Sequence, residues 1–337
     1  MKVTIKDVAE RAQVSVATVS RVLNQSKPVS PEIQDKVMRA VNELGFNPNP
    51  VARSLVMKKS LLIGVLIPNI ANMFFSVLVR GLEEECYKQQ YTTLLCNTNG
   101  EIDKELHYLN LMKDKYVDGV VILTSSLKEE HIQFFEENPI PVVFASQSNN
   151  GGGMFDCINI DDFQAAYDAT SFLIKWGHKK IGLLSGPLTD MESGFSRYSG
   201  FRKALEEHNL DFYEKWFSEG TYDIYSGFLR GKEILSRKER PTAIFCASDT
   251  MAMGLIHAAD EIGIRVPDEI SVMGFDDIPM AEAFRPGLTT VRQPIFELGA
   301  KAAKMLMEQI QKKSNHKKQL KILPHEIVVR KSCLKLL

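Results

Sequence analysis

The chain has 337 residues, of which 44% are hydrophobic and 25% are charged, and its formal net charge is -1. This length allows two or three globular domains with buried cores, and the composition is that of an ordinary soluble protein. No apolar run approaches the roughly 18 to 20 residues of a membrane-spanning helix, and the N-terminal residues lack the apolar core of a signal peptide. We therefore expect a cytoplasmic protein that has no membrane partner.

The charge is distributed unevenly along the chain. Residues 1–59 contain ten Lys and Arg against five Asp and Glu, a balance of +5 that leaves -6 for residues 60–337. A small basic segment joined to an acidic body predicts a polyanionic partner for the N-terminal segment alone. On charge alone, a solvated surface with a chance imbalance remains the alternative.

Three short helices are predicted in residues 1–46. Thr4 has the sequence context of a capping box, Ser15 is placed to cap the second helix, and Ser30 followed by Pro31 begins the third. Because only two or so residues join the first two helices, these helices must meet at a sharp angle, as they do in a helix-turn-helix.

The second helix has an unusual outward face. Its apolar residues Val19, Val22 and Leu23 share the inward face, which leaves mostly short side chains and one long cation outside: Val16, Ala17, Thr18, Ser20 and Arg21. Short side chains let a helix approach base edges in the major groove, where Arg21 could reach a guanine. A helix that only faced water would more often carry Glu and Lys pairs. The pattern therefore predicts a DNA-reading helix.

From residue 61 onward, short apolar runs alternate with amphipathic segments. Buried strands are predicted at 61–68, 91–98, 119–124, 141–146, 180–186, 243–248 and 270–276. A repeated strand-helix order predicts parallel sheets with helices on both faces, and the Gly- and Asn-rich segment 146–156 divides the pattern into two similar α/β lobes.

Ligands of open α/β sheets bind at the carboxyl ends of the strands, so the residues that follow each predicted strand are the candidates. They are Phe74, Phe75, Arg197, Asp249, Asp276 and Asp277. For three of them another role is open: Phe75 as a core side chain, Asp249 as a helix cap and Asp277 as a solvent-facing or turn residue.

Recognised catalytic and metal-binding motifs are absent from the sequence. The sequence has no hydrolase, phosphate-loop or metalloprotease motif, its histidines do not cluster, and its five cysteines are widely spaced in mostly apolar runs. We predict buried cysteines, no catalytic residue, no metal and no cofactor. A binding body fits better than an enzyme, and a sugar-processing enzyme with an accessory DNA-binding head remains the alternative.

Three segments carry a resemblance to a known family. TIKDVAERAQVSVATVSRVLN, NPNPVARSL and GFDDIPMAEAFRPGLTTVRQP closely resemble segments of the lactose-repressor/galactose-repressor (LacI/GalR) family of bacterial transcriptional regulators. The resemblance implies an all-α helix-turn-helix head at 1–46, a hinge helix at 47–59 and a two-lobed, periplasmic-binding-protein-like α/β body with parallel sheets at 60–337. The implied first lobe comprises about 60–160 and 290–323, and the second comprises about 161–289 and 324–337.

The resemblance also implies how DNA is bound. Members of the family act as homodimers on near-palindromic operators. We expect a repressor, and an activator is the alternative. The matching DNA-contacting positions are Thr4, Ser15, Val16, Ala17, Thr18, Arg21 and Asn24 in the head and Ala52, Arg53 and Leu55 in the hinge. The hinge of relatives becomes ordered on the minor groove, and Leu55 matches the residue that wedges into the central base step.

For the effector, the resemblance implies a small metabolite, above all a sugar or sugar derivative, between the lobes. The matching positions are Phe74, Phe75, Arg197 and Asp276, with Asn97, Asp161, Tyr222 and Ser248 as weaker candidates.

One alternative partner follows from a second similarity. The segment DKELHYLNLMKDKYVDGV is similar to catabolite-control-type members, whose corepressor is a phosphorylated carrier protein. Lys301 and Lys304 could contact such a partner, although Glu308 stands where that type has a cation.

Overall fold

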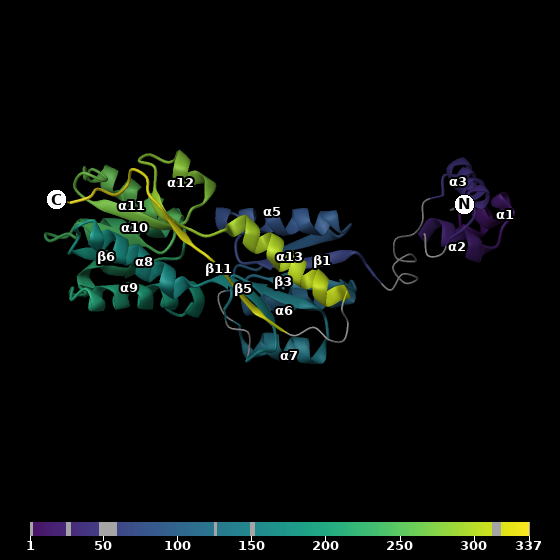
Figure 1. Ribbon diagram of the computed structural model, residues 1–337, viewed down its shortest axis with the longest axis horizontal. Coiled ribbons are helices and arrows are strands. Elements are labelled where there is room, and N and C mark those ends of the chain that lie inside the picture. The colour runs from purple at the N-terminus through teal and green to yellow at the C-terminus, as the bar shows by residue number, and fades with distance from the viewer. Residues whose placement is uncertain are drawn as a thin grey trace. The chain divides into compact units, whose positions relative to one another are not determined.

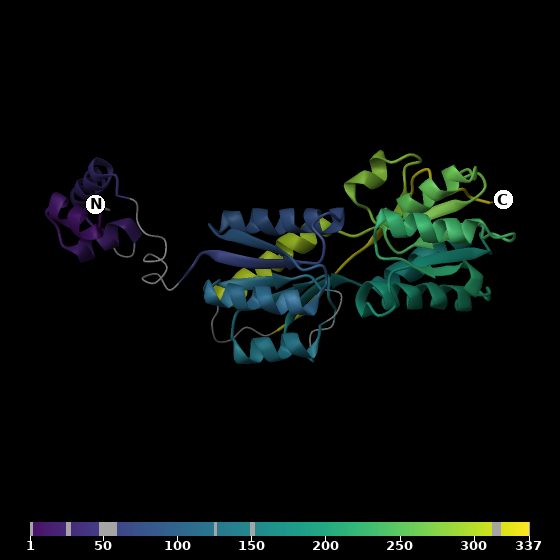
Figure 2. The same ribbon diagram turned by 180° about the vertical axis from the view of Figure 1, so that it is seen from behind.

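The structure is a computed structural model that describes residues 3–24, 28–46, 59–124, 127–148, 152–311 and 318–336 (Figures 1 and 2). It divides into two compact units, one formed by Met1–Leu61 with Lys115–Asp118 and the other by Leu62–Asp114 with Gly119–Leu337. We call the three-helix part of the first unit the head and the second unit the body. The predicted hinge helix, with its DNA-contacting residues Ala52, Arg53 and Leu55, and the side chain of Asn24 lie outside the described residues.

The head consists of α1 (Ile5–Ala12), α2 (Val16–Asn24) and α3 (Pro31–Leu44). Their shared core is small and apolar: Val8, Ala9, Ala12, Val19, Val22, Val37 and Ala40. At the start of α1, the N-H and hydroxyl of Thr4 both donate to Asp7, at 2.7 and 2.9 Å. At the start of α2, Ser15 Oγ accepts the N-H of Thr18 at 3.1 Å. These contacts confirm the predicted helix starts.

The start of α3 differs from the prediction in one detail. Ser30 precedes the helix, but its side chain forms no capping hydrogen bond. Its carbonyl oxygen instead accepts the N-H groups of Ile33 and Gln34, both at 3.0 Å. Pro31 at the first helical position already has a helical φ and no N-H to satisfy, so the helix starts without help from the serine hydroxyl.

The first lobe of the body is a parallel sheet with the strand order β11-β5-β4-β3-β1-β2. In chain order the strands are β1 (Leu62–Ile67), β2 (Thr92–Asn97), β3 (Gly119–Ile122), β4 (Val142–Ala145), β5 (Asp156–Ile160) and β11 (Leu320–Leu323). Its helices are α5 (Met73–Lys88), α6 (Ile102–Asp114), α7 (Glu129–Glu137) and α13 (Ile295–Gln311). Helices α5 and α13 pack closely against each other. The missing side chain of Gly299 permits this packing, because a Cβ on Gly299 would lie only 1.9 Å from the Leu78 carbonyl oxygen.

The second lobe has the strand order β12-β10-β9-β8-β6-β7, parallel except for β12. Its strands are β6 (Ile181–Ser185), β7 (Phe217–Glu219), β8 (Ala243–Cys246), β9 (Ser271–Asp276), β10 (Thr289–Arg292) and β12 (Glu326–Val328). Its helices are α8 (Asp162–Lys175), α9 (Ser196–Glu207), α10 (Ile224–Leu235), α11 (Asp249–Glu261) and α12 (Pro279–Ala283), with a π-helical turn at Met191–Phe195 before α9 and a 3-10 turn at Glu214–Trp216.

All seven strands predicted from apolar runs are present, and the five cysteines are buried as predicted. The prediction that all seven are buried is wrong for β2, which lies at the edge of its sheet and is largely half-buried or exposed. Strand β5 was missed because its sequence, DCINI, mixes polar and apolar residues. Its polar side chains are nevertheless buried. The cost of burying the Asp156 carboxylate is offset by hydrogen bonds that it accepts from Gln309 Nε2 at 2.7 Å and from the Gln319 N-H at 2.8 Å. Strands β7, β10 and β11 also carried no apolar signal.

The chain crosses between the lobes three times, near Asp161, near Gln293 and between β11 and β12. The second crossing lies slightly later than the boundary implied by the family resemblance, which placed residue 290 in the first lobe. Strand β10 pairs with β9 over residues 289–292 and therefore belongs to the second lobe. The return to the first lobe begins at Gln293.

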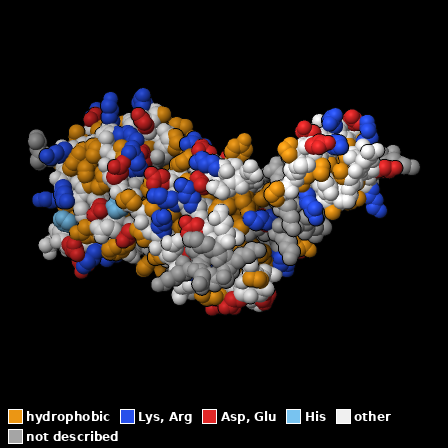
Figure 3. All heavy atoms as spheres, turned by 45° about the vertical axis from the view of Figure 1, so that its right-hand side comes forward, with side chains coloured by type: hydrophobic (Ala, Val, Ile, Leu, Met, Phe, Trp, Pro, Cys, Tyr) orange, Lys and Arg blue, Asp and Glu red, His pale blue; other side chains and the backbone are white. Residues whose placement is uncertain are grey.

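The surface of the body mixes charges of both signs, as the face in Figure 3 illustrates. Within the described residues, no helix combines the length and the apolar character that crossing a bilayer requires.

Candidate ligand pocket and DNA-reading helix

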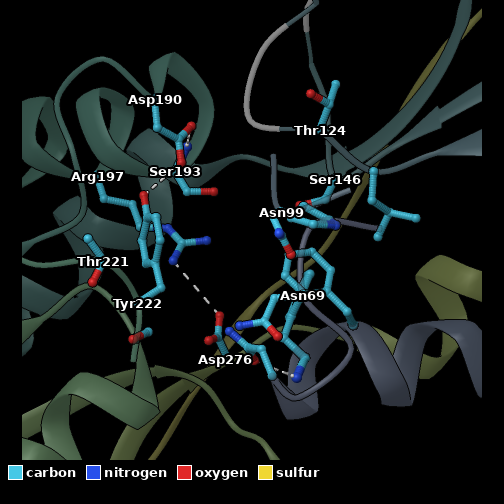
Figure 4. A pocket seen from close by; sticks show the side chains of 16 residues that line it. Asn69, Asn99, Thr124, Ser146, Asp190, Ser193, Arg197, Thr221, Tyr222 and Asp276 are labelled. Carbon is cyan, nitrogen blue, oxygen red and sulfur yellow. Dashed lines mark hydrogen bonds and ion pairs between the residues drawn. The ribbon is translucent and has the colours of Figure 1, made fainter. Parts of the chain in front are cut away.

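A cavity of about 370 Å³ lies between the two lobes of the body (Figure 4). The first lobe contributes Pro68, Asn69, Asn72, Phe74, Phe75, Asn99, Leu123, Thr124 and Ser146, and the second contributes Asp190, Ser193, Arg197, Thr221, Tyr222, Ser248 and Asp276. These residues end or follow eight of the parallel strands, four in each lobe. The cavity therefore occupies the position at which α/β sheets bind ligands.

Arg197 is held rigidly at the second-lobe wall. Its side chain is 4% exposed, its Nε donates to Asp162 Oδ1 at 2.7 Å, and its Nη1 donates to the Ala247 carbonyl oxygen at 2.6 Å. The guanidinium also lies over the Phe275 ring, 3.7 Å from the ring centroid. These two hydrogen bonds use two of its five N-H groups and fix the direction in which the other donors point.

Asp276 is the carboxylate nearest to Arg197 within the pocket. Its Oδ1 lies 3.8 Å from Arg197 Nη1 and accepts a hydrogen bond from Gln293 Nε2 at 2.8 Å. Burial raises the pKa of Asp276 to about 7, against the opposing influence of Arg197 and Gln293. Near neutral pH this carboxyl group therefore exists in both ionised and protonated forms, and it can accept or donate a hydrogen bond.

Asp190 and Tyr222 form a second polar pair. The Tyr222 hydroxyl donates to Asp190 Oδ2 at 2.7 Å, while Asp190 Oδ1 accepts the N-H groups of Glu192 and Ser193, both at 3.1 Å. Burial is the main cause that raises the pKa of Tyr222 well above its ordinary value. Because both oxygens of Asp190 and the hydroxyl of Tyr222 already have partners, this pair offers the cavity mainly an aromatic ring.

The first-lobe wall is polar without being charged. Asn72 caps α5 by accepting the N-H of Phe74 at 2.9 Å, and Asn99 Oδ1 accepts a hydrogen bond from Asn97 Nδ2 at 2.7 Å. Phe74 and Phe75 meet edge to face, with 5.3 Å between the ring centroids. This wall thus combines amide groups with aromatic surface.

Backbone strain is concentrated at the cavity. Among the described residues, ten other than glycine have positive φ, and four of these line the cavity: Asn99 at 59°, Ser146 at 57°, Tyr222 at 58° and Asp276 at 117°. A positive φ is costly for Tyr222, and the φ of 117° at Asp276 lies outside the left-handed helical region that Asp tolerates. Strained residues of this kind cluster at functional sites, where the surroundings enforce them. The strain supports a role for the cavity beyond packing.

Six of the eight residues predicted for the effector line the cavity: Phe74, Phe75, Arg197, Tyr222, Ser248 and Asp276. Asn97 and Asp161 do not. The Oδ1 of Asn97 instead accepts the N-H of Ile70 at 2.7 Å. Asp161 is exposed and caps α8 by accepting the N-H of Gln164 at 2.9 Å, because the chain turns from β5 into α8 at this residue.

Two of the alternative roles considered for neighbouring residues are wrong. Asp249 does not cap α11, because Ser248 does so by accepting the N-H of Met251 at 3.2 Å. Asp249 is fully buried, and its carboxylate accepts the N-H of Ile278 at 2.9 Å and the hydroxyl of Thr290 at 2.5 Å.

Asp277 does not face solvent either. Its side chain is only 7% exposed, and it lies between two cations, 2.6 Å from Arg292 Nε and 2.7 Å from Arg330 Nη1.

Several pocket residues were missed by sequence reasoning. Asn69 and Asn99 follow predicted strands, so the rule used for Phe74 could have found them if applied to every strand. Thr124 and Ser146 are the last residues of the predicted strands 119–124 and 141–146, and they follow β3 and β4 because these strands end earlier than predicted. Asp190, which lies in a loop before the π-helical turn, gave no local signal.

The predicted DNA-reading face of α2 is accessible. Ser15, Val16, Ala17 and Arg21 are exposed, with Val16 at 41%, and Thr18 is half-buried. Thr4, at the start of α1, is also exposed. The short side chains form an open surface from which Arg21 extends, as docking into a major groove requires.

A helix-turn-helix head joined to a two-lobed, periplasmic-binding-protein-like body defines a class of DNA-binding transcriptional regulators. The family described as "Bacterial regulatory proteins, lacI family" matches residues 4–49, and the "Periplasmic binding protein-like domain" matches residues 170–333. The chain belongs to the lacI family of bacterial regulatory proteins.

Relatives extend this match to the full chain. Catabolite control protein A of Priestia megaterium is 39% identical over 332 residues, covering 98% of this chain and 99% of that protein. The HTH-type transcriptional repressor PurR of Vibrio campbellii is 40% identical over 337 residues, covering 99% of each. Among solved structures, the lac repressor dimer bound to operator and the anti-inducer ONPF matches with a TM-score of 0.88 and 30% identity over 99% of this chain and 100% of that one. These relatives are transcriptional regulators, and so this protein is a regulator rather than an enzyme.

Proposed function

We propose that the protein is a homodimeric repressor whose affinity for a near-palindromic operator is controlled by an uncharged small metabolite, a sugar or sugar derivative, in the interlobe cavity. The observation that carries this proposal is the composition of the cavity. A fixed guanidinium, one available carboxylate, several neutral amides and hydroxyls, and aromatic rings converge on one space. Such a set suits a ring that is polar at its edges and apolar on its faces.

Hydrogen bonds at the cavity favour a polyhydroxylated ligand. Asp276 can accept from ligand hydroxyl groups, and Arg197 is aligned beside it at 3.8 Å. Asn69, Asn72 and Asn99 add neutral polar groups on the opposite wall, and the ring of Tyr222 offers an apolar surface.

Electrostatics disfavour an anionic ligand such as a sugar phosphate. Among the described residues that line the cavity, Arg197 is the one cation, and it is already paired with Asp162 at 2.7 Å. They also include two carboxyl groups, Asp190 and Asp276. A phosphate would therefore meet more negative than available positive charge in a space of low dielectric constant.

A thermal-shift screen tests this assignment. The panel contains D-ribose, D-glucose, cellobiose, glucose 6-phosphate and hypoxanthine. We expect at least one uncharged sugar to raise the melting temperature of the protein with increasing concentration, because a ligand that binds only the folded state stabilises it by mass action. Stabilisation by glucose 6-phosphate alone would contradict the proposal.

DNA reading is proposed for the exposed face of α2, with Arg21 as the direct base contact. Selection of binding sites from random-sequence duplex DNA should enrich near-palindromes. Arg21→Ala should then weaken binding to the selected site by about 1–3 kcal/mol and relax the base preference at one position in each half-site. Enrichment of sequences without two-fold symmetry would exclude the dimeric mode.

A second copy of the chain is the proposed partner of an apolar surface on the second lobe. Ile224 on α10 and Met280 on α12 are 52% and 40% exposed. A groove beside them is lined by Ile224, Met253 and Phe284. Exposed apolar surface of this kind marks an interaction site, and the solved dimer of the lac repressor supports association through like subunits.

The alternative partner, a phosphorylated carrier protein, has less support. Lys301 Nζ lies 2.9 Å from Glu297, and Lys304 Nζ lies 3.9 Å from Glu85, so both cations already have acidic neighbours. A pull-down with the phosphorylated carrier protein would reveal that partner directly, with the unphosphorylated protein as control.

A further inference from the structure

We infer that Gly186 is a specificity-determining residue: its lack of a side chain lets the ring of Tyr222 lie against the end of β6, and this position sets the width of the interlobe cavity. This inference rests on the proposed function, because it takes the cavity to be the binding site of an effector.

The geometry leaves no room for a side chain at residue 186. An ideal Cβ on Gly186 would lie 2.0 Å from both Cζ and Oη of Tyr222 and 2.4 Å from its Cε1. These are the three nearest atoms, and all belong to the one phenol ring. The φ of Gly186 is not in the left-handed region, so its backbone would accept alanine and the obstacle is the ring itself.

The backbone of Tyr222 cannot retreat easily from such a side chain. Its carbonyl oxygen accepts a hydrogen bond from Thr250 Oγ1 at 2.8 Å, and its φ of 58° already places it in a restricted region. The ring is therefore the part that must move.

The loop that faces the ring is equally fixed. Asp190, which accepts the Tyr222 hydroxyl, also accepts two N-H groups of the π-helical turn. In that turn a Cβ on Gly194 would lie 1.9 Å from the Pro187 carbonyl oxygen, so the turn is packed directly against the segment after Gly186. Tyr222 lines the cavity, where its hydroxyl pairs with Asp190 (Figure 4). We therefore expect a ring displaced by a side chain at residue 186 to change the shape of the cavity and to lose its hydrogen bond to Asp190.

The expected consequence is a narrower cavity with an unpaired phenol. A ligand that lies on the face of the Tyr222 ring loses its place, and a larger ligand loses more than a smaller one. Gly186 thus acts on the ligand through Tyr222, as a positioning residue.

A double-mutant cycle tests this relation. Gly186→Ala is made in the wild-type protein and in Tyr222→Ala, and sugar binding is measured by calorimetry with D-ribose and cellobiose as a small and a large probe. We expect Gly186→Ala to lower the affinity of the sugars that the wild-type protein binds by about tenfold or more, and by less than about twofold in the Tyr222→Ala background.

Gly287→Ala is the matched control, because the nearest atom to a Cβ on Gly287, in the same lobe, is 3.6 Å away. Its affinity for sugars should equal that of the wild-type protein. In protein labelled with 3-fluorotyrosine, the resonance of residue 222, assigned by its absence in Tyr222→Phe, should shift in Gly186→Ala and stay in place in Gly287→Ala.

Two results would overturn the inference: an unshifted fluorine resonance in Gly186→Ala, or an equal loss of affinity in both backgrounds. Failure of the wild-type protein to bind any metabolite of the thermal-shift panel would instead contradict the proposed function. The fluorine resonance would still decide whether Gly186 holds the ring.

Discussion

The two walls of the interlobe cavity are built on different physical principles. The second-lobe wall carries all the charged lining residues, Asp190, Arg197 and Asp276, and each is held by further hydrogen bonds within the protein. The first-lobe wall carries amides, hydroxyls and aromatic rings without a formal charge. A ligand would therefore be oriented by the preorganised second lobe and gain weaker, neutral contacts from the first.

This difference has a consequence for control of the head. A neutral hydrogen bond contributes only a small net free energy. A ligand can therefore gain or lose its contacts with the first lobe at a small cost in binding free energy. If the protein is controlled as proposed, we expect a ligand held by the second lobe to favour closing of the first lobe by about 1–3 kcal/mol, the usual range of coupling between binding sites.

The largest effect is expected for Arg197→Ala. Removing this buried guanidinium leaves Asp162 and Asp276 without their cation, and breaking a buried pair in this way costs about 3–5 kcal/mol. Urea unfolding should show that loss, and sugar binding should disappear. Arg230→Ala, which removes an exposed cation paired with Glu233 in the same lobe, should change the stability by less than about 1 kcal/mol.

Asp276→Asn separates the binding role of the second-lobe wall from its stability. The amide keeps the size of the carboxylate and can still accept from Gln293, but it lacks the charge that attracts ligand hydroxyl groups. Sugar affinity should fall by about tenfold or more. Stability at pH 8 should be unchanged or higher, because the variant no longer buries a negative charge. Full retention of sugar affinity would remove Asp276 from the proposed site.

The pH dependence follows from the same carboxyl group. Because burial raises its pKa to about 7 from the ordinary 3.8, the folded protein retains this proton at pH values where the unfolded chain has released it. Its contribution to stability therefore falls as the pH rises from about 4 to about 7. Sugar affinity should increase as the pH rises through 7 and the group ionises. Both pH dependences, that of the stability and that of the sugar affinity, should be weaker in Asp276→Asn than in the wild-type protein. Identical pH dependences in the two proteins would show that Asp276 does not cause them.

The smallest effect is expected on the first-lobe wall. Asn99→Ala removes one neutral hydrogen-bonding group from the cavity and should weaken sugar binding by about 0.5–1.5 kcal/mol. We expect a loss of stability of about 1–2 kcal/mol, because alanine tolerates the φ of 59° at this residue less well than asparagine and Asn97 loses its acceptor. Calorimetry and urea unfolding measure the two quantities. A loss as large as that of Arg197→Ala would erase the distinction between the walls.

Features that depend on residues close together in the sequence could be predicted, and features that depend on residues far apart could not. The head could be predicted because its helix starts depend on neighbours such as Thr4 and Asp7, three residues apart. The parallel strands of the body could be predicted because burial on both faces makes them continuous apolar runs. Strand β5 could not, since Asp156 is buried only because Gln309 and Gln319, far along the chain, satisfy it.

The same reasoning separates the pocket residues that were found from those that were missed. Arg197 and Asp276 were identified through the family resemblance and the rule on strand ends. The burial of Asp277 could not be foreseen, because it depends on Arg292 and Arg330 from other elements. The role of Gly186 depends on Tyr222, which reaches it from the end of another strand.

The central claim is that the body controls the head through the ligand, and reciprocal titration tests it most directly. The affinity for an effector sugar is measured with and without saturating operator duplex, and the affinity for the operator is measured with and without saturating sugar. We predict that both affinities change by the same factor, because linkage requires it. A sugar that binds equally well in the presence and absence of the operator would contradict the account.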